Sequence, residues 1–387
     1  MQGFPAGGQQ IVGVNTKVTV WNWTIRGNRI IEPGTGLYLG GSEGDTPFVA
    51  GVIEGNVVVN PVGYCMQIKH QNDYTPLADM PAGPSRTIVR HNVFMKDDRE
   101  SPDGDRPNLL VGGFPDAGAG AEDVYDVYGN LLLSNPREAL FQATGRVAIH
   151  DNLFVGGNDG FAALVVTAHQ GKSVKLAHLY NNTVYTTGTG IAITQMAEQD
   201  DAVVGNLVLA GTPISGEIAD ERDNLVAAFA DAGDYVNAPG VMLGADFYPL
   251  VGAVEGTSID LSKFADQPDY DRDFNGMSKG GFTFRGAYAG AGEDPCGPLD
   301  DVIDECVGGS EDTGGSEGGV DESGGSEGSA SAGTTGGGSM TTAASTSAGA
   351  GEETGGDTSG CGCGAARLHA TWWLVVVPVI RRRRARS

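Results

Sequence analysis

The stretch Ile149-His-Asp-Asn-Leu-Phe154 places an aliphatic residue three positions before an Asn and an apolar residue two positions after it. The same spacing occurs seven times between Ile25 and Val208. Successive Asn residues are 22 to 38 positions apart, which is enough for one coil of chain with loops of varying length. A supersecondary unit that repeats at this length indicates a solenoid. The repeated residues are Asn28, Asn56, Asn92, Asn130, Asn152, Asn182 and Asn206.

The segments around each Asn alternate between apolar and other residues, as in Val147-Ala-Ile-His150 and Ile191-Ala-Ile-Thr194. This alternation is typical of short strands with one buried face. Several of the Asn residues follow a Gly, and an Asn can adopt the left-handed conformation and bond to the backbone at a bend. Stacked amides can form a ladder. The sequence therefore predicts an all-β chain that forms a right-handed parallel β-helix, a single-stranded solenoid whose handedness follows from the preference of parallel connections.

Two coils and the end of the repeat carry a resemblance to a known family. Ile149-His-Asp-Asn-Leu-Phe154 and Leu179-Tyr-Asn-Asn-Thr-Val-Tyr185 resemble coils of the pectin-lyase-like right-handed β-helix superfamily. Asp271-Arg-Asp-Phe-Asn-Gly276, followed by Phe284-Arg-Gly-Ala-Tyr288, is similar to the end of many bacterial members. The resemblance covers about residues 15–290. It implies the fold, and it leaves the chemistry open because the superfamily contains lyases, hydrolases and proteins without known activity.

Composition divides the chain into four regions. We expect the β-helix in residues 1–290, with further coils and a signal peptide upstream of this chain, and a Cys-bounded end segment in 291–306. Residues 307–360 are mainly Gly, Ser, Thr, Ala, Glu and Asp without Lys or Arg, which predicts a disordered acidic linker. The formal net charge of −25 argues against nucleic acid as a partner and favours cations such as Ca²⁺. We expect a monomer.

The last region, residues 361–387, contains two Cys residues, a short apolar run and four consecutive Arg residues. The apolar run, Trp372–Ile380, is shorter than the ~20 residues of a spanning helix. The arrangement resembles C-terminal sorting signals of myxobacterial surface proteins. That resemblance implies attachment to the membrane with the Arg cluster on the cytoplasmic side, a place at the cell surface, and processing or lipidation at Cys361 or Cys363. A plain peripheral tail is the alternative.

The remaining cysteines do not form a disulfide-rich framework. Cys296 and Cys306 bracket the end segment and could pair in an oxidising compartment. Cys65 lies in a strand pattern and is expected to be a small core residue.

Polar residues gather on adjacent middle coils. Removing the proton α to a uronate carboxylate needs a base and a group that neutralises the carboxylate. Lys69 or His70 is the candidate base, and Arg90 or Arg106 is the candidate neutraliser. A Ca²⁺ ion held by loop carboxylates is a further neutraliser, and an ordinary solvated surface is the alternative for all of these residues. The metal candidates are Asp97, Asp98, Asp103 and Asp105, and the substrate-binding candidates are Gln67, His91, Gln142 and His150.

Two classes of function follow from these observations. One is a surface-tethered enzyme on polysaccharide, with a polysaccharide lyase acting on uronate-containing glycans favoured over a glycoside hydrolase. A hydrolase needs two carboxylates placed across the substrate, and here the carboxylates come from a single loop. The other class is a non-catalytic β-helix that binds glycan or serves as an adhesin or scaffold.

Overall fold

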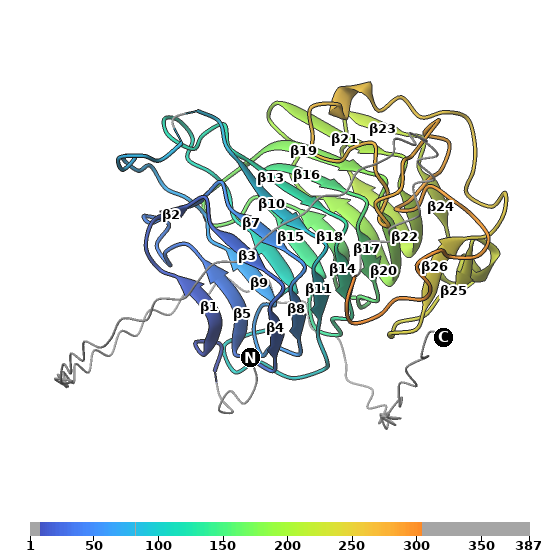
Figure 1. Cartoon of the computed structure of the whole chain (residues 1–387), viewed down its shortest axis with the longest axis horizontal. Helices are drawn as coiled ribbons and strands as arrows, with labels where there is room; N and C mark the ends of the chain where they lie inside the picture. The colour runs from blue at the N-terminus through green and yellow to red at the C-terminus, as the bar shows by residue number, and fades with distance from the viewer. Residues whose placement is uncertain (1–7, 82, 304–387) are drawn as a thin grey trace, which may run out of the picture. The chain divides into compact units, whose positions relative to one another are not determined.

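The computed structural model describes residues 8–81 and 83–303, which lie in one compact unit. This part of the chain is nearly all β and forms two long parallel sheets of 14 and 8 strands. In Figure 1 the coils advance from the blue N-terminal strands to the green strands of the middle of the chain. Parallel strands stacked coil on coil are the arrangement of a β-solenoid, as the repeat predicts.

Each coil contributes one strand to the smaller sheet. Its strands are β3 (Thr24–Arg26), β7 (Val52–Glu54), β10 (Arg86–Arg90), β13 (Val124–Tyr128), β16 (Gly145–His150), β19 (Val174–Tyr180), β21 (Asp200–Val204) and β23 (Asp220–Arg222).

The larger sheet has two arms, which the long strands β20 and β22 join. The first arm contains β4 (Arg29–Ile31), β8 (Val57–Val59), β11 (Val93–Met95), β14 (Leu131–Leu133), β17 (Leu153–Val155), β20 (Thr183–Ile193), β22 (Leu207–Gly216) and β24 (Leu225–Ala227). The second arm contains β1 (Val12–Thr16), β5 (Thr35–Leu39), β9 (Met66–Ile68), β12 (Leu109–Val111), β15 (Phe141–Ala143) and β18 (Ala162–Val166).

The apolar positions of the repeat form the core. Val89, Val127 and Ile149 are in register across β10, β13 and β16 and are fully buried. On the other side of the corner, Phe94 and Phe154 are equally buried. Burying one large aliphatic or aromatic side chain contributes about 1.5–3 kcal/mol, so the stacked coils derive their stability from these repeated positions.

The Asn residues form a continuous ladder along one corner. The backbone N and Nδ2 of Asn92 both donate to Oδ1 of Asn130, at 3.0 and 2.9 Å. Nδ2 of Asn92 also donates to the carbonyl of Ile53 in the preceding coil, at 2.9 Å. The ladder extends to an eighth residue, Asn224, which the spacing rule misses because Glu221 occupies the position that is aliphatic elsewhere.

The residue before each ladder Asn makes the turn. Its φ angle is positive in every coil, for example 62° at Gly129, 53° at Asp151 and 50° at Asn181. The interpretation that the ladder Asn itself takes the left-handed conformation is therefore wrong. Gly, Asp and Asn tolerate this conformation better than other residues, which explains the Gly that precedes several ladder residues.

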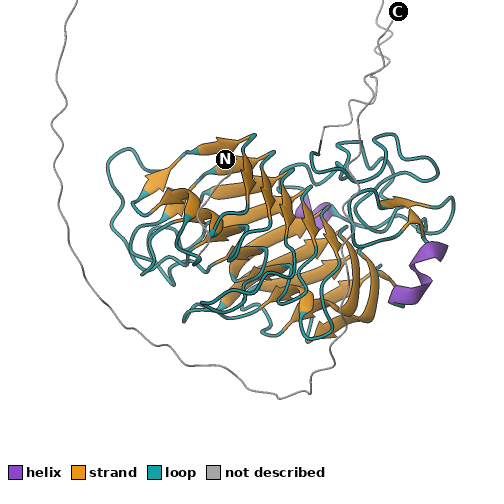
Figure 2. Ribbon diagram, turned by 90° about the horizontal axis from the view of Figure 1, so that it is seen from below, coloured by secondary structure: helices purple, strands orange, loops and turns teal. Residues whose placement is uncertain are grey.

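The parallel strands end at Ala227, earlier than the boundary at residue 290 that the sequence suggests. Residues 229–303, which we call the C-terminal wrap, are mostly irregular and are coloured yellow and orange in Figure 1. Helical turns in the described chain occur only in the wrap (Figure 2). Its elements are the 3-10 helices η1 (Phe229–Asp234) and η2 (Ser262–Phe264) and the antiparallel pair β25 (Val236–Ala238) and β26 (Asp246–Pro249). In the first coils, a separate parallel pair is formed by β2 (Val20–Trp21) and β6 (Phe48–Val49).

The C-terminal wrap packs on the outer face of the small sheet and on the first arm of the large sheet. Phe247 and Phe274 belong to one apolar cluster with Leu131 and Leu153 of the large sheet. Around Phe264, a second cluster joins the wrap to the small sheet. These contacts make residues 229–303 part of the same folded unit.

The expected linker at 307–360 and the tail at 361–387 lie outside the described residues. Within residues 8–81 and 83–303, no helix has the length and apolar character needed to cross a membrane.

Candidate functional site

A row of outward-facing side chains crosses the second arm of the large sheet. Their strand neighbours, such as Met66 and Ile68, lie in the core, and strand alternation therefore directs the row away from it. The row brings together two of the predicted substrate-binding residues. Its members, in register from β5 to β18, are Tyr38, Gln67, Leu110, Gln142 and Val165.

Lys69 lies directly after β9, two residues beyond Gln67 of this row. Its relative exposure is 8%, and its Nζ donates to Oε1 of Gln170 at 3.4 Å. Nδ1 of His70 lies 2.6 Å from the same oxygen, so Nδ1 carries the hydrogen if this oxygen is the acceptor. One amide oxygen therefore positions both candidate bases.

A tight turn carries Gln170 to this position. His169 and Lys172 exchange two backbone hydrogen bonds of 3.0 Å, and Gln170 and Gly171 between them have φ angles of 51° and 74°. Two positive φ angles are required by a type I′ turn. The turn packs against Gly113, where a Cβ atom would lie only 2.3 Å from Cβ of Lys172. Gly113 therefore permits the close approach.

Arg106 is held by its own loop. Its Nη1 donates to the carbonyl of Asp105 at 3.0 Å, and its Nη2 donates to the carbonyl of Asp103 at 2.8 Å. The guanidinium also lies 5.9 Å from the ring centroid of Tyr64, within the range of a cation–π contact. Lys96 donates to the Arg106 carbonyl at 2.7 Å. These contacts give the guanidinium a defined position.

The charges around Lys69 interact with one another. Burial lowers the pKa of Lys69; Glu43 opposes this shift, and the positive charge of Arg106 adds to it. Burial also lowers the pKa of His169, and the charges of Lys69, His70 and Arg106 lower it further. Lys69 and His70 therefore share one partner, the amide oxygen of Gln170, and Arg106 belongs to the loop before β12, the strand next to β9. We call Lys69, His70, Arg106, His169 and Gln170 the Lys69 cluster.

Arg90 and His91 are not part of this cluster. Arg90 ends β10 in the other sheet, where its guanidinium pairs with Glu54 at 2.8 Å and with Asp269 at 3.3 Å. His91 is the corner residue that follows, with its ring 6.0 Å from that of Tyr128. Arg90 therefore lies in a different sheet from Lys69, whereas Arg106 precedes β12, the neighbour of β9.

His150 is a buried structural residue. Its ring stacks between those of Tyr128 and Tyr180, at centroid distances of 4.8 and 4.6 Å. Its Nδ1 lies 2.7 Å from Oδ2 of Asp151, and burial lowers its pKa well below the ordinary range. The expectation that His150 faces substrate is wrong because the C-terminal wrap covers it.

Each of the four carboxylates proposed as metal ligands has a hydrogen-bond or ion-pair partner within the protein. Among the described residues, no group of three or more His, Cys, Asp or Glu is placed to hold a metal ion. The predicted Ca²⁺ site therefore has no geometric support in this loop. The partners are Arg99 for Asp97 at 3.2 Å, Arg137 for Asp98 at 3.0 Å and for Asp105 at 3.7 Å, and the Gln9 backbone N–H for Asp103 at 3.3 Å.

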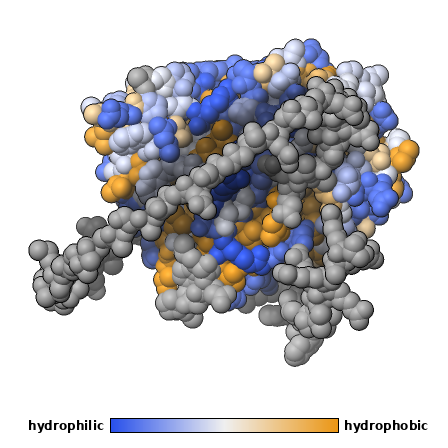
Figure 3. Space-filling view, viewed as in Figure 1, coloured by the Kyte–Doolittle hydropathy of each residue, from blue (hydrophilic) through white to orange (hydrophobic). Residues whose placement is uncertain are grey.

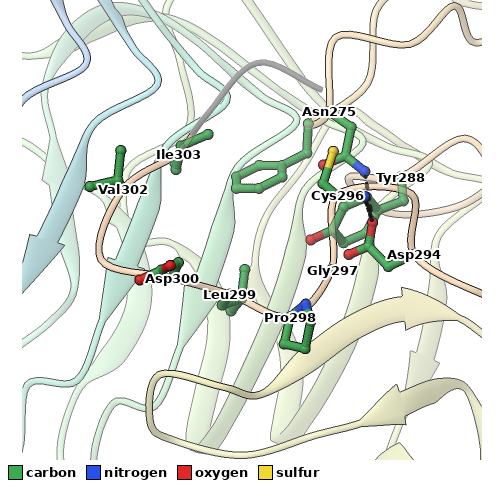
Figure 4. A pocket seen from close by; sticks show the side chains of 11 residues that line it. Asn275, Tyr288, Asp294, Cys296, Gly297, Pro298, Leu299, Asp300, Val302 and Ile303 are labelled. Atoms are coloured by element: carbon green, nitrogen blue, oxygen red, sulfur yellow. Dashed lines mark hydrogen bonds between the residues drawn. The ribbon is translucent and has the colours of Figure 1, made fainter. Parts of the chain in front are cut away.

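A cavity of about 280 Å³ lies within the C-terminal wrap (Figure 4). Its polar lining includes Asn275, whose Nδ2 donates to Asp294 at 3.1 Å. The described residues that line it include two Asp and no Lys, Arg or His, so it cannot neutralise an acidic sugar. Hydrophilic residues also occupy much of the face shown in Figure 3. Polar side chains at the surface therefore do not by themselves locate a site.

Sequence reasoning missed His169, Gln170 and Tyr64 as members or neighbours of the cluster. The dipeptide Gln170-Gly171 is a signal of a tight turn, and it could have suggested a projecting loop. Its contact with a residue about 100 positions earlier follows only from the stacking of coils.

Cys296 is disulfide-bonded, while its predicted partner Cys306 and the tail residues Cys361 and Cys363 lie outside the described residues. Cys65 is buried and reduced, as expected of a core residue. Comparison of the chain with family models, with curated proteins and with solved structures finds no match.

Proposed function

We propose that the protein is a right-handed parallel β-helix that acts on uronate-containing polysaccharide, with lyase chemistry at the Lys69 cluster. The observation that carries the proposal is the sharing of the Gln170 amide oxygen by Lys69 and His70 beside the outward row, in a chain of formal charge −25. A local concentration of positive charge in an acidic protein attracts an acidic ligand to that place.

Lys69 is the proposed base. Its lowered pKa increases the fraction of neutral amine, which alone can accept a proton. Arg106 is the proposed neutraliser, because a guanidinium can bond two carboxylate oxygens at once. Neutralising the carboxylate makes the α-proton acidic enough to be removed, and expulsion of the β-oxygen then forms the C=C bond. His70 and His169, whose pKa values are also lowered, are available to relay protons to the leaving oxygen.

The outward row would hold the polymer. Five strands separated by roughly 4.8 Å give a track of about 19 Å, which is long enough for several sugar units. Gln142, which is partly exposed, offers an amide group along this track, with the partly exposed Tyr38 at one end.

The proposal is tested by incubating the protein with pectate, alginate and glycosaminoglycans, with Ca²⁺ or with a chelator. Formation of an unsaturated product is followed by its ultraviolet absorbance. Lys69→Ala should abolish the activity. The matched control is Lys175→Ala, which removes a lysine of β19 that pairs with Asp116 and Glu198, and it should keep the activity. Absence of product from every polyuronate, with the fold intact, would reject the lyase proposal.

A non-catalytic glycan-binding role is the second candidate. The half-buried rings of Tyr38 and Tyr64 and the amides of the row would bind sugar whether or not a reaction follows. Saturable binding of an acidic glycan without product, lost in Arg106→Ala, would favour this function.

The surface tether belongs to the same proposal. We infer that residues 307–360 act as an acidic spacer and residues 361–387 as a sorting segment that anchors the chain, with Cys361 or Cys363 processed. Fractionation of producing cells tests this. Removing residues 361–387 should release the protein to the medium, and a full-length cytoplasmic protein with an uncut tail would contradict it.

A further inference from the structure

The corner residues before the ladder Asn form a second row on the outside of the solenoid. Asp151 and Asn181 occupy this position in adjacent coils, with φ angles of 53° and 50°. Ladder bonding of the residues that follow them sets the two corners side by side. The next corner is Gly205, where a Cβ atom would lie 3.3 Å from Nδ2 of Asn181. An acid and an amide are therefore held next to each other by the backbone.

Lys279 of the C-terminal wrap reaches both groups. Its Nζ lies 2.8 Å from Oδ2 of Asp151 and 3.3 Å from Oδ1 of Asn181, and it also donates to the carbonyl of Tyr270 at 2.9 Å. All three side chains are almost completely buried, since the relative exposure is 6% for Lys279 and 2% for each of the others. An amine, an amide and a carboxyl group thus meet without access for bulk water.

The surroundings exclude an external substrate. A cavity of only about 10 Å³ borders Asn181, Lys279 and Phe282, which is about the space of one water molecule. The ring of Tyr180 lies 5.3 Å from Nζ of Lys279. Any chemistry of this group must therefore occur within the protein, with a product no larger than ammonia or water leaving.

The charged form of Asp151 is costly at this place. Burial raises the pKa of Asp151 to about 8 although the nearby Lys279 lowers it. Its Oδ1 is buried without a hydrogen-bond partner. Transfer of a proton from Lys279 to Asp151 removes both buried charges and leaves a neutral amine, which is the nucleophilic form.

We propose that Nζ of Lys279 and Cγ of Asn181 become joined by an intramolecular amide bond, with Asp151 transferring the proton. The neutral amine attacks Cγ and the carbonyl electrons move onto Oδ1. The protonated Asp151 delivers its proton to Nδ2 and takes another from Nζ, so that it ends protonated. The C=O bond then re-forms, the Cγ–Nδ2 bond breaks, and ammonia leaves. One amide replaces another, so no oxidant or other co-reactant is needed.

This bond links the wrap to the coils. Lys279 and Asn181 are 98 positions apart, and the bond would close the chain between them into a loop. The outer face of the small sheet would then remain covered even when the noncovalent contacts of the wrap are broken.

The test uses the full chain after reduction of disulfides. The intact mass should be lower than the sequence mass by one ammonia, and proteolysis should yield a branched peptide that joins Asn181 to Lys279. Unlinked peptides that contain unmodified Lys279 and Asn181 would overturn the proposal. Loss of one water, with Lys279 joined to Asp151, would equally overturn it.

Two variants and a control identify the groups. Lys279→Arg and Asp151→Asn should both retain the ammonia and yield separate peptides. The control Lys263→Arg alters a wrap lysine that pairs with Asp200 at 3.0 Å, and it should keep the cross-link. A cross-link that persists in Asp151→Asn would refute the role of Asp151. The peptide map of the unmodified sequence decides the bond itself even if a variant does not fold.

Discussion

The outer faces of the two sheets carry similar side chains and use them differently. On the large sheet, Lys69 and His70 share the side chain of Gln170, which a tight turn presents at the surface. On the small sheet, His150 is fully buried between the rings of Tyr128 and Tyr180, and Arg90 pairs with Asp269 of the C-terminal wrap. The comparison shows that outward Lys, Arg and His residues differ in what positions them, which is a short turn on one face and the wrap on the other.

The largest difference between the faces should appear in activity. Lys69→Ala should reduce the rate of uronate elimination by about 10²–10⁴-fold, the usual contribution of a positioned base. His150→Ala should leave the rate of the folded protein unchanged. Kinetics measured below the melting temperature of each variant test this difference. An equal loss in both variants would contradict the assignment of the active face.

The free energy of unfolding should show the opposite order for the two faces. Truncating an aromatic core residue costs roughly 3–5 kcal/mol, and His150→Ala removes a ring that stacks on Tyr128 and Tyr180. His70→Ala is the matched control, because His70 is only half-buried. Chemical denaturation of both variants measures the effect. A larger loss for His70→Ala would show that the large-sheet face is the structural one.

The ladder between the faces should weaken most at its centre. Asn152 accepts two bonds from Asn130 and donates to Asn182 from its backbone and side chain. Each bond contributes roughly 0.5–1.5 kcal/mol, so Asn152→Leu should be clearly destabilising. Asn224→Leu, at the end of the ladder, should cost less. Equal melting temperatures for the two variants would argue against a cooperative ladder.

The smallest effect should be in the pH dependence of the elimination rate, which depends on Lys69 beside the large sheet. The proposed base acts only when it is unprotonated, so the elimination rate should rise with pH and level off above the pKa of Lys69. Burial lowers that pKa, so the rise should end at a lower pH than for a solvated lysine. Rate profiles across neutral and alkaline pH test this. A rate that falls with increasing pH would exclude Lys69 as the base.

Much of the architecture could be predicted because it repeats. The apolar position three residues before each Asn is set by the two-residue period of a strand, and in the structure it is core from Ile25 to Val203. Asn224 was missed because the last coil carries Glu221 at that position. The end of the coils was also misplaced, since the segment Asp271–Tyr288 belongs to the wrap and not to a strand of the parallel sheets.

The candidate site was only partly predictable. Lys69 and Arg106 are selected by residue type, and the strand register sets Lys69 after the end of β9 and Arg106 before the start of its neighbour β12. Gln170 was not found, because its turn reaches Lys69 through three-dimensional stacking rather than through local sequence.

The sequence by itself determined the repeat, the strand faces and the Asn ladder, because each depends on residues within a few positions of one another and on identical neighbours in the next coil. Which outward residues are covered by the C-terminal wrap depends on the tertiary structure alone. Residues 229–303 return over coils formed much earlier in the chain, and Phe264 and Lys279 meet Tyr180 and Asp151 there. No local period records such a contact, since it depends on the path of an irregular segment across a finished surface.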